Sequence, residues 1–138
     1  MARQYSNRTN PNGAISANGA YYLGNFKSFR DVVLEILATN SPDMTVKFYT
    51  SDQPAENNGD LPDPTASLAT DNVYEISSFN DYKTGEVVAG DTGLVISAED
   101  SRRVEINANF TTHLWAVISN YSAGNLNIWA TGSDVGEA

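Results

Sequence analysis

The one histidine of the chain, His113, is the first residue to consider for chemistry. It begins the stretch HLWAVISNYSAGNLNIW, residues 113–129, which also contains both tryptophans, Trp115 and Trp129. Nucleophilic catalysis would require a hydroxyl or thiol beside the histidine and an acid that orients the imidazole. The sequence contains no cysteine and no Gly-x-Ser-x-Gly motif, which in many hydrolases presents the nucleophile. We therefore expect His113 to be a polar residue at a strand end, in a protein that is not an enzyme.

Acidic residues are the second candidate, because paired carboxylates support glycoside hydrolysis and clustered ones bind calcium. Most acids of this chain lie in predicted turns, where Asp is favoured because its side chain bonds to nearby backbone groups. A long loop over residues 51–71 carries Asp52, Asp60 and Asp63, but its spacing matches no EF-hand. A solvated acidic loop is the simpler interpretation, with a calcium site as the alternative. We expect no metal and no other cofactor.

The aromatic side chains carry more information than the titratable ones. In LNIWATG, residues 126–132, two-residue alternation places Leu126, Ile128 and Ala130 toward a core and Trp129 away from it. An outward Trp anchors a protein interface or stacks on a sugar, unless another element such as the N-terminal segment or the long loop covers it. Tyr21 and Tyr22 are adjacent, so one of them must also face away from the core. All three are candidate interface or stacking aromatics: Tyr21, Tyr22 and Trp129.

β-strands must position these side chains, because apolar residues recur with a period of two from Ala20 onward. In RRVEINANF, for example, Val104 and Ile106 alternate with Arg103 and Glu105, which is typical of a half-buried strand. Turn-forming residues separate eight or nine such segments, which predicts an all-β antiparallel sandwich, jelly-roll-like. A short helix over residues 31–39 is the alternative there. Strands are expected at residues 21–27, 31–39, 43–51, 72–77, 82–88, 93–98, 102–110, 113–121 and 126–131.

The charge distribution divides the chain unevenly. The net charge is −9, but residues 1–30 contain four basic residues and no acid, so all 17 acids lie in residues 31–138. An acidic body repels phosphate, so we expect no nucleic-acid partner, and no apolar run approaches the roughly 20 residues of a membrane span. We expect an irregular basic arm over residues 1–20, a sandwich over 21–131 and a flexible tail over 132–138. The predicted contact cations are Arg3, Arg8, Lys27 and Arg30.

The region from Gly90 to Trp129 resembles a group of small virion structural proteins of tailed bacteriophages, often encoded near the major capsid protein. The shared pattern is a Gly-Asp-Thr-Gly turn at residues 90–93, an Arg-Val-Glu-Ile-Asn strand at 103–107, a Trp-bearing strand at 115–118 and Tyr-Ser-Ala-Gly at 121–124. Residues 23–51 resemble the opening strands of the group. Each motif alone is common in sandwiches, and it is their order that is specific.

The resemblance implies a non-enzymatic virion role, in a group whose members attach either to the head or to the tail. We expect a capsid decoration, or cement, protein on the exterior of the virion capsid. The expected partners are the major capsid protein and further copies of the chain, with a trimer favoured because identical patches meet around a symmetry axis. The basic arm would pair with acids of the capsid surface, and the aromatics would anchor protomer contacts. The alternative is a carbohydrate-binding sandwich for host attachment, in which Trp129, Tyr21 or Tyr22 stacks on sugar.

Overall fold

The computed structural model describes residues 3–26, 29–51, 74–107 and 113–135 of the chain. The described residues form nine strands and no helix, and the strands pair antiparallel in one continuous sheet. The all-β antiparallel fold expected from the sequence is confirmed. The strands are β1 (Arg3–Tyr5), β2 (Gly19–Asn25), β3 (Asp31–Ser51), β4 (Tyr74–Glu75), β5 (Ser78–Asp81), β6 (Glu86–Ala89), β7 (Leu94–Ile96), β8 (Asp100–Asn107) and β9 (His113–Val135).

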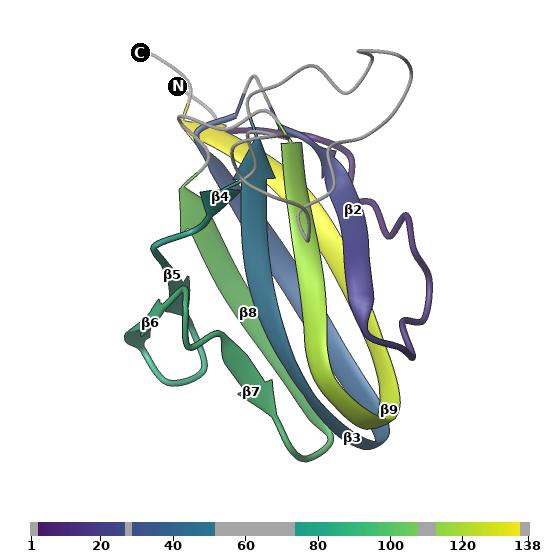
Figure 1. Cartoon of the computed structure of the whole chain (residues 1–138). Helices are drawn as coiled ribbons and strands as arrows, with labels where there is room; N and C mark the ends of the chain where they lie inside the picture. Colours follow the sequence, from purple (N-terminus) through teal and green to yellow (C-terminus); the bar gives the residue numbers. More distant parts are fainter. Residues whose placement is uncertain (1–2, 27–28, 52–73, 108–112, 136–138) are drawn as a thin grey trace.

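Two long strands, β3 and β9, form the frame of the molecule. They pair from Asp31 opposite Ser133 to Ser51 opposite His113, and the register shifts only near residues 39–45. At this point both strands bend sharply, and each passes from one layer of the molecule to the other (Figure 1). Asn40 and Ser41 take left-handed φ angles of 61° and 54° at the bend, a conformation that Asn and Gly tolerate best. One folded-over sheet therefore makes both layers.

Each layer is completed by shorter strands at its sides. The β8 layer contains the first half of β3 and the second half of β9, flanked by β1 on one side and by β8, β5 and β6 on the other. The β2 layer contains the second half of β3 and the first half of β9, flanked by β2 and by the short strands β4 and β7. The mean strand directions of the two layers can be followed in Figure 1.

The core lies between the two layers and follows the predicted alternation. Phe48 of the β2 layer meets Phe79 of the β8 layer edge to face, with ring centroids 5.1 Å apart. This geometry is favourable for aromatic pairs. Alternate positions of β3, β8 and β9 supply most of the core, as the sequence predicts: Val32, Leu34, Ile36, Ala38, Met44, Val46, Phe48, Val104, Ile106, Leu114, Ala116, Ile118, Leu126, Ile128 and Ala130.

Three predictions of elements need correction. The strands expected at 31–39 and 43–51 are one bent strand, as are those at 113–121 and 126–131, because the turn residues between them bend the chain without breaking its pairing. The strand expected at 82–88 is confirmed only over 86–88, within β6, because residues 82–85 turn between β5 and β6. The Asp81 side chain accepts a hydrogen bond from the backbone N–H of Lys83 at 3.0 Å. Gly85 takes φ 74°, a left-handed conformation that fits a turn and not a strand.

The N-terminal arm is docked on the sheet along the free edge of β9. Its strand β1 pairs with residues Ser133 to Val135, so β9 continues past residue 131, where we expected the sandwich to end. Farther along the arm, the backbone of Thr9 exchanges two hydrogen bonds with Ala130, and that of Ile15 exchanges two with Leu126. Ile15 is buried in the core. The arm is irregular between these contacts, as expected, but it belongs to the folded domain.

Candidate interaction surface

The outer face of the β8 layer carries a row of aromatic and charged side chains. In the strand register, Glu35 of β3 lies opposite Trp129 of β9 on one side and opposite Arg103 of β8 on the other. All three alternate with core residues, so they point away from the core, as the sequence predicts for Trp129. We call this surface the Trp129 face and define it by Arg8, Glu35, Leu37, Tyr82, Ser101, Arg103 and Trp129.

Arg8 joins the N-terminal arm to this face. Its guanidinium carbon lies 4.7 Å from the centroid of the Trp129 ring, a cation–π distance. The same guanidinium donates to both carboxylate oxygens of Glu35, at 3.2 and 3.4 Å. The side chains of Arg8 and Glu35 are about half exposed, at 49% and 50%, so the contact holds the arm in place with a modest energy. The arm thus covers part of Trp129, as one alternative interpretation of the sequence proposed.

Arg103 lies at the other end of the row. Its guanidinium carbon is 5.6 Å from the centroid of the Tyr82 ring, and Tyr82 is 53% exposed. Partial burial and a hydrogen bond to Glu105 raise the pKa of Tyr82, so its hydroxyl stays neutral at physiological pH. Within the described part of the chain, Arg103 makes no ion pair. The face thus ends at Arg103, whose guanidinium contacts the Tyr82 ring and is not neutralised by an ion pair within the described residues.

A shallow pocket of about 410 Å³ opens between these two arginines. Its apolar lining residues are Trp129, Ile36 and Leu37, of which Leu37 is 38% exposed. The complete lining is Arg8, Glu35, Ile36, Leu37, Ser101, Arg102, Arg103 and Trp129. The arrangement of an aromatic ring, an exposed aliphatic side chain and guanidinium groups is suited to contact with another molecule, since Trp, Tyr and Arg dominate interface energies.

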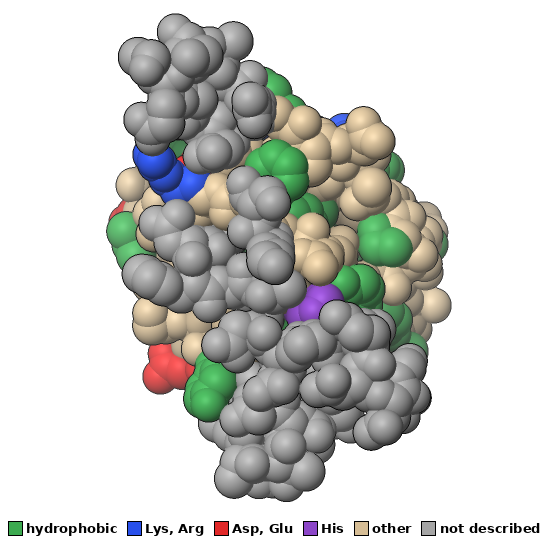
Figure 2. Space-filling model, turned by 90° about the horizontal axis from the view of Figure 1, so that it is seen from above, with side chains coloured by type: hydrophobic (Ala, Val, Ile, Leu, Met, Phe, Trp, Pro, Cys, Tyr) green, Lys and Arg blue, Asp and Glu red, His purple; other side chains and the backbone are tan. Residues whose placement is uncertain are grey.

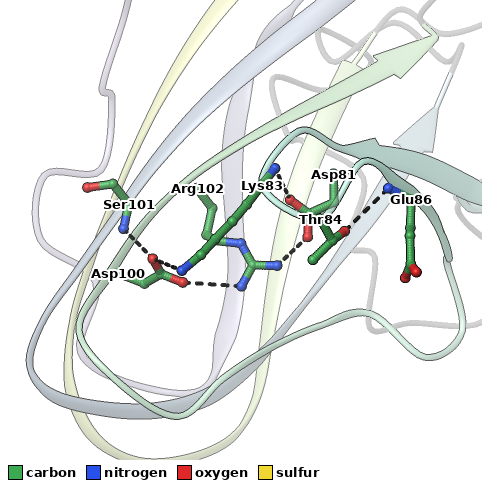
Figure 3. Close-up of polar contacts among 7 residues, drawn as sticks. All are labelled: Asp81, Lys83, Thr84, Glu86, Asp100, Ser101 and Arg102. Atoms are coloured by element: carbon green, nitrogen blue, oxygen red, sulfur yellow. Dashed lines mark hydrogen bonds and ion pairs between the residues drawn. The ribbon is translucent and has the colours of Figure 1, made fainter.

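A partly buried ion-pair network fixes the position of β8 and of the β5–β6 turn (Figure 3). Arg102 of β8 pairs with Asp81 of β5 and with Asp100, and Lys83 of the turn pairs with Asp100 at 2.5 Å. Burial alone would raise the pKa of Asp81, but hydrogen bonds from Arg102 and from the backbone of Lys83 outweigh it and lower that pKa. The hydrogen bond from Lys83 lowers the pKa of Asp100. Both carboxylates are therefore charged when the protein is folded.

His113 lies in a ring cluster at the end of the β2 layer. Its Nδ1 is 2.9 Å from the hydroxyl oxygen of Tyr22, and the three rings of His113, Tyr22 and Trp115 are 5.6 to 5.9 Å apart. His113 and Trp115 are each 2% exposed, and the histidine shows only a small surface in the view from above (Figure 2). The histidine does lie at a strand end, but it is buried and not at an open rim.

The structure separates the other predicted site residues. Tyr21 packs against the core and donates to the carbonyl of Ala17 at 2.9 Å, so Tyr22 is the member of the pair that faces away. Arg30 is exposed just before β3 and does not line the pocket. Arg3 belongs to β1. Four predicted residues lie outside the described residues: Lys27, Asp52, Asp60 and Asp63.

Sequence reasoning did not identify Glu35, Arg103 and Tyr82 as members of a site. The alternation of residues 31–39 and 102–107 did place Glu35 and Arg103 on the wet face of their strands. What the sequence lacked was the pairing of β8 with β3, which brings them beside Trp129. In the described ranges, no three His, Asp or Glu residues lie together in a way that could hold a metal ion. Those ranges also hold no helix long and apolar enough to cross a membrane.

Comparison with known proteins identifies a similar fold. No family model matches the sequence, and no curated protein matches it. The solved structure of the SPBc2 prophage-derived protein YomS aligns with a TM-score of 0.61 at 9% sequence identity. The alignment covers 97% of this chain and 96% of that protein. The two proteins thus share a fold over almost their whole length.

Proposed function

We propose that this chain is a virion structural protein of a tailed phage, of the capsid decoration type. Two findings support a phage origin: the ordered motifs of residues 90–129 and the fold shared with a prophage-derived protein. The observation that carries a binding role is the Trp129 face, where Trp129, Arg8 and Arg103 surround a pocket on an outward sheet surface. Decoration proteins act by adhesion, for which such a face is suited.

The mechanism we propose is binding across subunit junctions on the exterior of the shell. A protein that binds only the assembled shell stabilises the assembly by mass action. The folded-over frame of β3 and β9 holds the face rigid, so little conformational entropy is lost on binding. We further propose a homo-oligomer, with a trimer favoured, since identical faces repeated around an axis bind a repeating shell with increased avidity.

Sedimentation with purified shells that lack the protein tests this proposal. Wild-type protein is expected to sediment with the shells and to raise their thermal disruption temperature. The W129A variant is expected to lose roughly tenfold or more in affinity, because truncation of a central Trp costs about 2 kcal/mol at many interfaces. The control is Y74A, which removes a 53% exposed aromatic side chain from β4, on the other layer.

The thermal midpoint of each free variant shows that it is folded before shells are added. Equal affinity of W129A and Y74A would remove the Trp129 face from the interface. Failure of the folded wild-type protein to bind shells at all would refute the decoration role.

A further inference from the structure

We propose that the pocket on the Trp129 face receives the carboxylate of an Asp or Glu side chain from a partner protein, with Arg103 as its main ligand. The inference rests on the proposed function, since it names the chemistry of the partner that this same face would bind. The sequence predicted contact cations in and near the arm. This inference names a different cation, Arg103 of β8, and a defined pocket.

The charges around the pocket leave one cation without a partner. Arg8 pairs with Glu35, and Arg102 pairs with Asp81 and Asp100. Among the described residues, the third lining arginine, Arg103, has only the ring contact with Tyr82. Glu35 lies opposite Arg103 in the strand register, but its carboxylate is engaged by Arg8. Glu105, on the same outward face of β8, is hydrogen-bonded to Tyr82 and forms no ion pair with Arg103 within the described residues. A guanidinium without an ion pair is a local site for an anion even in a chain of net charge −9.

The geometry favours a carboxylate held in a fixed orientation. Both exposed arginines of the pocket lie against aromatic rings, Arg8 on Trp129 and Arg103 on Tyr82. Ring contacts restrict the guanidinium groups, so less side-chain entropy is lost when a carboxylate binds. Guanidinium groups match carboxylates through two parallel hydrogen bonds, and Ser101 also belongs to the lining.

The apolar part of the pocket indicates that the carboxylate belongs to a polypeptide. Leu37 and the Trp129 ring lie beside the charged groups, and Tyr82 is exposed at the outer end of the row. A free inorganic anion would leave these apolar surfaces in water, whereas an acidic side chain with an apolar neighbour would cover them. About 410 Å³ is also more room than a single carboxylate needs.

NMR titration of the full-length protein tests the pocket without a shell. The probe is the blocked tripeptide acetyl-Leu-Glu-Leu-amide, and its matched control is acetyl-Leu-Gln-Leu-amide. We expect the Glu peptide to shift the Trp129 indole and Arg103 Nε–H signals and to bind roughly fivefold to tenfold more tightly than the Gln peptide, because a charged hydrogen bond replaces a neutral one. The R103Q variant should abolish this preference. The K47Q variant, which removes a cation from the outer face of the β2 layer, should retain it.

Equal binding of the two peptides, or an unchanged preference in folded R103Q, would overturn the inference. So would binding of glucuronate through Arg103 without any preference between the peptides, because the pocket would then be a site for acidic sugars. The shell experiment separates this inference from the function on which it rests. If wild-type protein and R103Q bind shells equally well, the carboxylate pocket is wrong and the decoration role stands. If wild-type protein prefers the Glu peptide but binds no shell, the decoration role is wrong and the pocket stands.

Discussion

At the residue scale, the buried charge of Asp81 explains why the β5–β6 turn lies where it does. Asp81 is 2% exposed, and an isolated carboxylate at such a site would be costly. Here the cost is offset because Arg102 and the backbone of Lys83 both donate to it. The same residue therefore ends β5, begins the turn and joins it to β8, which carries Arg103 of the Trp129 face.

We predict that D81N lowers the free energy of unfolding by about 3 kcal/mol, because it leaves Arg102 buried with one anionic partner fewer. Chemical denaturation at pH 7 measures this change. The control is K83Q, which removes the partner of Asp100; the Lys83 side chain is 52% exposed. K83Q is expected to cost less than about 1 kcal/mol. Equal losses in the two variants would contradict the buried pair.

The lowered pKa values of Asp81 and Asp100 give the same prediction a pH dependence. In the unfolded chain the pKa of an Asp is about 3.9, above the lowered values in the folded protein. The unfolded chain therefore takes up protons at a higher pH than the folded chain. The stabilisation is complete above that value and is lost as the pH falls through it toward the lower folded pKa values. We expect a steeper acid loss of stability in the wild type than in D81N between about pH 4 and pH 2.5.

At the element scale, the two bends at the tip of the sheet depend on close packing between β3 and β9. Gly124 of β9 has φ 94°, and a Cβ atom at this position would lie 2.4 Å from the Cα of Pro42. Backbone atoms cannot move aside as a flexible side chain can, so only glycine fits here. This contact lets both long strands turn between the layers at the same height.

We predict that G124A destabilises the protein by at least about 3 kcal/mol or prevents folding, because it adds a backbone clash to an unfavourable φ. The matched control is G85A in the β5–β6 turn, which also has positive φ, 74°, but no atom within 4 Å of the added Cβ. G85A should lose only about 1 kcal/mol, the cost of the left-handed conformation alone. Thermal unfolding of the two variants measures the difference, and similar midpoints would show that the bends do not need this contact.

The elements also show where sequence reasoning reached its limit. Alternation predicted most of the strands, the core positions of β3, β8 and β9, and the outward direction of Trp129, because period-two burial is a local property. It did not predict β1 or β5. It could not predict that β8 lies beside β3, since strand order and register depend on the whole fold. The strand expected at residues 82–88 began too early: Val87 and Val88 do lie in β6, but Tyr82, which also has high strand propensity, lies in the turn. The hydrogen bond from the Lys83 backbone to Asp81 holds that turn.

At the scale of the whole molecule, the shared strands make the two layers one cooperative unit. Separate sheets in a sandwich are joined by loops, but here β3 and β9 each contribute to both layers. Neither layer can lose its central strand pair without loss of pairing at the tip of the other. We infer that the protein has no stable half-folded form.

Two single-Trp variants test this cooperativity. In W129F, the remaining Trp115 reports on the β2 layer, and in W115F the remaining Trp129 reports on the β8 layer. The two substitutions change stability by different amounts, so the variants are not compared with each other. Within each variant, the unfolding midpoint from fluorescence is compared with the midpoint from circular dichroism. We predict that the two midpoints coincide within each variant, as in two-state unfolding. A fluorescence transition that precedes the loss of strand signal in either variant would show independent layers.

The pairing of β1 with the last residues of β9 has a practical consequence. Arg3 lies opposite Val135, so both ends of the folded domain emerge at one pole, far from the bends of β3 and β9 (Figure 1). A reporter fused to either end would project from that pole and leave the opposite pole unobstructed. We therefore expect amino-terminal and carboxyl-terminal fusions to place a reporter at the same pole of the molecule.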